Sequence, residues 1–196
     1  MKFIFILFVS MIVLGFQADA LAQISPSKPL PPNAAAAKPL YKPETAFSTT
    51  ASAWALKEGT STIAGQGFLK AQGGFIQTAA GETVTLVPKS PYTDEIVSIT
   101  RKDGFFEEYS GVQKDPEYEP FRRVITADKN GAFRFEGLPA GEWYIATRVI
   151  WFTRDQLGNV ALNGGLLWGV ITTVEGQALE NIKLNSTDEL LRYGPQ

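Results

Sequence analysis

Acidic side chains gather near the middle of the chain, where their spacing could serve metal binding or hydrolysis. Asp115, Glu117 and Glu119 alternate, so in an extended strand they would line one face and could bind a divalent cation. Glu107 and Glu108 could act in glycoside hydrolysis if a second carboxylate lay about 5 to 10 Å away. A solvated loop face explains both groups more simply. We therefore predict no catalytic residue and no metal ligand among them.

The chain contains no histidine and no cysteine, which removes most catalytic chemistry at neutral pH. A Ser-His-Asp triad, a Cys-His pair and a zinc site built from histidine or cysteine are excluded. We expect a protein that is not an enzyme and that uses no cofactor. A hydrolase based on carboxylates alone stays open as a minor alternative.

The run Asp128, Lys129, Asn130, Gly131 has two interpretations. Oxygen ligands from Asp and Asn suit calcium, but the later ligands of a calcium loop, including its closing Glu, are missing. Asn followed by Gly supplies the positive φ angles that a tight hairpin needs. We predict a plain hairpin turn.

Aromatic side chains are the candidate contact residues, because their flat faces stack on sugar rings and on protein surfaces. The alternative is that most of them fill the core. The six candidates are Tyr92, Phe105, Phe106, Tyr109, Trp151 and Trp168.

The N-terminus has the three parts of an export signal. Met1 and Lys2 form a basic start, an apolar run from Phe3 to Phe16 follows, and Ala20-Leu21-Ala22 fits a cleavage site. The apolar run is about fourteen residues, whereas a membrane-spanning helix needs about twenty. We predict a signal peptide, residues 1–22, cleaved between Ala22 and Gln23, and a periplasmic or secreted protein.

Composition limits the partners of the mature chain. The full chain has 18 Lys and Arg against 20 Asp and Glu, and removal of Lys2 and Asp19 with the signal peptide leaves this balance unchanged, so there is no basic field for nucleic acid. After Phe16 no apolar stretch is long enough to span a membrane. Residues 23–53 are rich in Pro, Ala and Ser and cannot bury much apolar area, so we predict a disordered tether there.

Short strands joined by Gly, Pro and Asn-Gly turns fill residues 54–185 and predict an all-β domain. We expect an antiparallel Greek-key β-sandwich of about seven strands, followed by a polar tail, residues 186–196. A long excursion, residues 89–120, interrupts the strands, and we predict one short helix in it from Thr93 to Lys102. The longest predicted strand, Glu142 to Phe152, is apolar on both faces, so it is either covered or part of an interface.

One segment resembles a known family. Residues 126–144, TADKNGAFRFEGLPAGEWY, closely resemble the hairpin core of carboxypeptidase regulatory-like domains, whose fold is similar to transthyretin (prealbumin). In that family a strand similar to residues 81–88, GETVTLVP, precedes the hairpin. The resemblance implies a non-catalytic module that stands alone in the bacterial envelope. The chain has no His-x-x-Glu pair, so peptidase activity does not carry over.

Together these observations predict a non-catalytic exported binding or structural module of the cell envelope. Its expected partner is an envelope protein, contacted through the loop of residues 89–120 and the aromatic surface. The alternative is a carbohydrate-binding module that contacts a glycan through exposed aromatic rings.

Overall fold

The computed structural model describes residues 41–71, 73–102, 112–187 and 191–194. The predicted signal peptide, the first part of the predicted tether, and Phe105, Phe106 and Tyr109 lie outside the described residues. Among the described residues, no helix is both long enough and apolar enough to cross a membrane.

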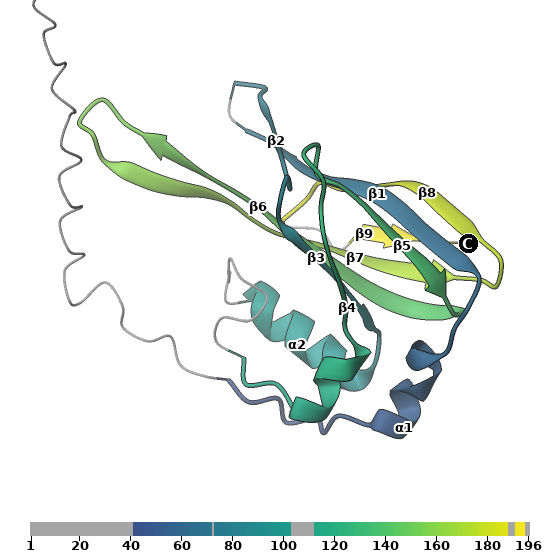
Figure 1. Ribbon diagram of the computed structural model, residues 1–196. Coiled ribbons are helices and arrows are strands. Elements are labelled where there is room, and N and C mark those ends of the chain that lie inside the picture. Colours follow the sequence, from purple (N-terminus) through teal and green to yellow (C-terminus); the bar gives the residue numbers. More distant parts are fainter. Residues whose placement is uncertain (1–40, 72, 103–111, 188–190, 195–196) are drawn as a thin grey trace, which may run out of the picture. The chain divides into compact units, whose positions relative to one another are not determined.

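The described part of the chain forms nine strands in two sheets (Figure 1). The first sheet consists of β1 (Ser61–Lys70), β2 (Ile76–Thr78), β5 (Ala132–Leu138) and β8 (Ala178–Leu184). The second sheet has the order β4 (Arg123–Thr126), β3 (Thr83–Pro88), β6 (Gly141–Arg154), β7 (Val160–Thr173) and β9 (Leu191–Tyr193).

Short helices connect or precede the strands. They are α1 (Thr49–Ser52), the 3₁₀ helix η1 (Ala53–Leu56), α2 (Pro91–Lys102) and the 3₁₀ helix η2 (Pro116–Phe121). The helix predicted from Thr93 to Lys102 is therefore confirmed as α2, which begins two residues earlier.

The predicted β-sandwich is confirmed, with two differences in its strands. First, the nine strands exceed the expected number of about seven, and one of them, the three-residue β9, lies in the predicted tail. Second, β8 runs parallel to β1 and β9 runs parallel to β7, so the sheets are mixed rather than purely antiparallel. The predicted polar tail is also corrected, because the Tyr193 hydroxyl in β9 donates to the Lys183 carbonyl.

The boundary predicted at residue 53 is too late, since the folded domain already includes residues 41–53. Phe47 is buried, with 8% of its surface exposed, and packs edge-on against Tyr92, Tyr118 and Phe121. The backbone N–H groups of Glu44 and Thr45 also donate to the carboxylate of Glu95 in α2, at 2.7 and 2.8 Å. One aromatic anchor and one carboxylate thus hold a segment whose average composition suggested disorder.

The core lies between the two sheets, and Trp143 is its largest fully buried side chain. Its ring meets Trp54 edge-on at 4.8 Å, and its Nε1–H donates to the Thr173 hydroxyl at 3.1 Å. Residues of β6 with the same parity as Trp143, such as Ile145 and Val149, also face this core. The other face of β6 carries Tyr144, whose hydroxyl donates to Asp94 of α2.

The longest strand is covered along one part of its length and exposed along another, so the expected cover is confirmed for the first part. Near Tyr144, α2 covers the outer face of β6, whereas the far ends of β6 and β7 pair only with each other in the described structure. We call this two-stranded projection the arm, residues 150–164 (Figure 1). Phe152 on the arm is 70% exposed, and Leu157 at its tip is 89% exposed.

Candidate functional site

Three of the six aromatic residues predicted to form a contact surface are described by the structure, and these three do not come together on the surface. Tyr92 and Trp168 are buried, so their assignment to an exposed contact is wrong. Tyr92 belongs to the cluster around Phe47, where its hydroxyl accepts from the Asp115 N–H at 2.6 Å. Trp168 pairs with Ala146 on the face of the second sheet that α2 covers. Trp151 is half-buried and packs against the core.

The alternating acids do not line one face, because they lie in the 3₁₀ helix η2 rather than in a strand. Asp115 caps this helix by accepting from the Glu117 N–H at 2.9 Å, and Glu119 pairs with Arg122 at 2.6 Å. No group of three or more acidic, His or Cys side chains that could hold a metal ion occurs within the described residues.

The turn predicted at residues 128–131 is confirmed, but the predicted hairpin is wrong, because β4 pairs with β3 in the second sheet and β5 pairs with β1 in the first. The turn carries the chain from one sheet to the other. The Asp128 carboxylate accepts from the Asn130 and Ala132 N–H groups, both at 2.8 Å. These hydrogen bonds, led by the one from Ala132, lower the pKa of Asp128. Gly131 has a φ of 77°, as the turn requires. The Asp128 carboxylate, which could have suggested calcium binding, thus accepts hydrogen bonds from backbone N–H groups of the turn.

Two further carboxylates, Glu95 and Asp155, are held by hydrogen bonds. Glu95 and Asp155 have lowered pKa values because they accept hydrogen bonds, mainly from side chains at Thr45 and Asn159. A general acid at neutral pH needs the opposite shift. With Asp128, these are the described carboxyl groups whose pKa shifts clearly, and all three shift downward.

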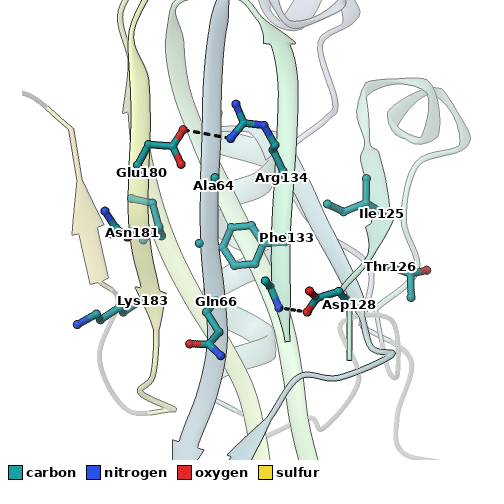
Figure 2. Close-up of a pocket in the computed structure, with 13 residues that line it drawn as sticks. Ala64, Gln66, Ile125, Thr126, Asp128, Phe133, Arg134, Glu180, Asn181 and Lys183 are labelled. Carbon is teal, nitrogen blue, oxygen red and sulfur yellow. Dashed lines mark hydrogen bonds and ion pairs between the residues drawn. The ribbon is translucent and has the colours of Figure 1, made fainter. Parts of the chain in front are cut away.

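A shallow groove lies on the outer face of the first sheet. It has a volume of about 780 Å³ and crosses β8, β1 and β5 (Figure 2). It arises from strand alternation, since Ile63 and Gly67 of β1 face the core while Ala64 and Gln66 face outward. Gly65 must lack a side chain, because a Cβ there would lie 2.3 Å from the Ile182 carbonyl oxygen.

Two rows of side chains run across this groove. In the first row, Ala64 pairs with Arg134 of β5 and has Glu180 of β8 on its other side. In the second row, Gln66 pairs with Ala132 of β5 and with Lys183 of β8. A small alanine thus lies beneath long polar side chains, and this difference in size makes the hollow.

An ion-pair network spans the first row. Arg134 donates from Nε to Glu136 at 2.6 Å and from one Nη to Glu180 at 3.1 Å, which joins β5 to β8 above Ala64 (Figure 2). The two carboxylates, Glu136 first, raise the pKa of Arg134. The guanidinium is therefore charged and fixed in orientation before any ligand arrives.

The second row offers hydrogen-bonding groups to the groove. The Gln66 side chain donates through Nε2 to the Asn130 carbonyl at 2.7 Å, which orients its amide. Asn181 lies at an irregularity in the pairing of β8 with β1 and has a φ of 63°, rare for a residue other than glycine. Its side chain and that of Lys183 also line the groove.

Sequence reasoning missed this groove. The alternation of Thr62 to Ala71 was visible in the sequence, but the partners of Ala64 come from β5 and β8. The one signal in the sequence is that Arg134 and Glu136 alternate with Phe133 and Phe135, as on a strand with one polar outward face.

No family model and no curated protein matches the chain. A solved structure does: a crystal structure from Pseudomonas aeruginosa, PA1324, described as a proposed carbohydrate-binding protein. The two share a TM-score of 0.62 and 23% sequence identity, over 72% of this chain and 99% of that chain. At this identity the similarity shows the fold.

Proposed function

We propose that the chain is a non-catalytic module of the cell envelope that binds carbohydrate in the groove over β8, β1 and β5. The observation that carries the proposal is the row of Arg134 and Glu180 bridging above Ala64. The fold shared with a protein described as a proposed carbohydrate-binding protein supports the same assignment.

The groove has the chemistry that a saccharide requires. Each sugar hydroxyl both donates and accepts, so a binding site must offer donors and acceptors close together. The donors here are the guanidinium of Arg134 and the ammonium of Lys183, and the acceptors are Glu180 and the side-chain oxygens of Gln66 and Asn181. Because ion pairs already hold Arg134, less side-chain freedom is lost on binding.

The test is a glycan array probed with the mature chain, residues 23–196, and with two matched variants. Ala64→Trp fills the groove, whereas Ala161→Trp makes the same change on the exposed arm, on β7. We expect Ala64→Trp to weaken binding about tenfold or more, a loss of about 1.4 kcal/mol or more. Ala161→Trp should bind as the unaltered chain does, with circular dichroism confirming both folds.

Two results would contradict the proposal. If the chain binds none of the arrayed glycans, the proposal that it binds carbohydrate is contradicted. If only Ala161→Trp loses binding, the glycan contacts the arm and not the groove.

Contact with a protein is the second candidate function, and the arm is the observation that favours it. Phe152, Leu157, Val160 and Leu162 expose apolar surface there, as interaction sites commonly do. Crosslinking in envelope extract would then capture a protein with the unaltered chain but not with Ala161→Trp. Equal capture by both would exclude the arm.

The export signal belongs to the same proposal. The basic start, apolar run and small-residue site predict a mature chain that begins at Gln23. Mass spectrometry of the protein recovered from the producing cell should therefore find Gln23 as the N-terminal residue. An intact Met1 would contradict export by cleavage.

A further inference from the structure

The outer face of β1 continues beyond the groove to an aromatic residue. Gly67 faces the core, because a Cβ there would lie 2.8 Å from the Thr147 methyl and 3.0 Å from the Ala79 Cβ. Phe68 is the next residue along the strand, so its ring lies on the outer face with Ala64 and Gln66. This ring is half-buried rather than part of the core.

A second hollow lies at this ring. Its volume is about 350 Å³, and it is lined by Phe68, Leu69 and Lys70 of β1 and by residues 185–187, which follow β8. Leu184 pairs with Gly67, so Asn185 lies beside Phe68. Gln66 and Lys183 line the groove on the same two strands, so the linings of the two hollows lie two residues apart on β1 and on the β8 segment.

Both hollows combine an aromatic ring with polar side chains. Phe133 lines the groove beside Arg134 and Glu180. Phe68 lines the second hollow beside the polar side chains of Asn185, Ser186 and Thr187. A pyranose ring has apolar C–H faces and a rim of hydroxyl groups. It can stack one face on an aromatic ring while neighbouring polar groups bind its rim.

We infer that the ligand is a linear oligosaccharide that lies along β1 and β8, with one sugar unit in the groove and another stacked on Phe68. This inference rests on the proposed carbohydrate binding. From Ala64 to Phe68 the strand rises about 13 Å, at about 3.3 Å per residue. That length exceeds a single sugar ring, so a monosaccharide cannot occupy both hollows.

The experiment is a calorimetric titration with oligomers of one to four units. The probes are glucose, N-acetylglucosamine and galacturonate oligomers, which represent neutral, N-acetylated and acidic chains. We expect affinity to rise about three- to tenfold when a chain becomes long enough to reach Phe68, the range that one ring stacking contributes. Phe68→Ala should lose this rise and keep the affinity for the shortest ligand that binds.

Matched variants separate this effect from damage to the fold. Phe68→Leu keeps an apolar side chain but lacks the flat ring, so it should lose most of the rise while folding normally. Phe152→Ala removes an exposed phenylalanine from the arm and should behave as the unaltered chain.

The outcomes also separate the inference from the proposed function. A monosaccharide that binds as tightly as its tetramer, or a rise that survives in Phe68→Ala, overturns the second subsite. If the second subsite is overturned but Ala64→Trp still weakens binding, the proposal that carbohydrate binds in the groove is supported. Absence of binding by all three oligomer series overturns both.

Discussion

Replacing Trp143 with alanine is expected to lower the free energy of unfolding by about 3–5 kcal/mol, the usual cost of removing a large buried aromatic ring. Trp143 is fully buried, and its loss would leave a cavity beside Trp54. It would also remove the N–H that donates to the Thr173 hydroxyl. A domain of this size is stable by about 5–15 kcal/mol, so the variant would be close to unfolding at higher temperature.

Denaturant titration followed by circular dichroism measures this loss, and Trp151→Ala is the matched control. Trp151 has the same parity on β6 but is only half-buried, so the same substitution should cost clearly less. Trp143→Phe should fall between the two, since it keeps part of the ring volume and loses the N–H. A loss below about 1 kcal/mol for Trp143→Ala would contradict the core described here.

The second large effect is expected at Phe47. Phe47→Ala should cost about 3 kcal/mol, because the ring contacts three aromatic neighbours that bury it. The control is Phe75→Ala, since Phe75 is 71% exposed and its removal should be nearly neutral. Thermal unfolding monitored by circular dichroism distinguishes the two variants. Equal melting temperatures would mean that residues 41–53 are a tether after all.

The sequence predicts best those features that depend on neighbouring residues. The strand at residues 83–88 and the turn at Asp128 follow from alternation and from turn chemistry within a few positions. The helix α2 follows in the same way from the acidic side chains in its first turn, and its last turn carries Arg101 and Lys102.

Features that depend on distant residues escaped prediction. Whether Trp168 is buried depends on tertiary packing, since β7 buries residues of both faces, Leu167 on one and Trp168 on the other. The segment around Phe47 looked disordered because composition averages over many residues, whereas one ring and the Glu95 carboxylate anchor it. The groove is formed by Ala64, Arg134 and Glu180, which lie on three different strands. The pairing register of these strands cannot be derived from the sequence of any single strand.

The parallel pairing of β1 with β8 has a consequence for the order of folding. Thr62 pairs with Ala178, 116 positions further along the chain, and the segment between them must be closed into a loop before that contact forms. Contacts of such high sequence separation are slow to form, because loop-closure entropy opposes them until the pairing is made. On a chain emerging from the ribosome, β1 could pair with β2 and β5 earlier, but its pairing with β8 would wait for nearly the whole protein to be synthesised. The groove can therefore exist only on the finished molecule, so nascent or C-terminally truncated chains would not compete for its ligand.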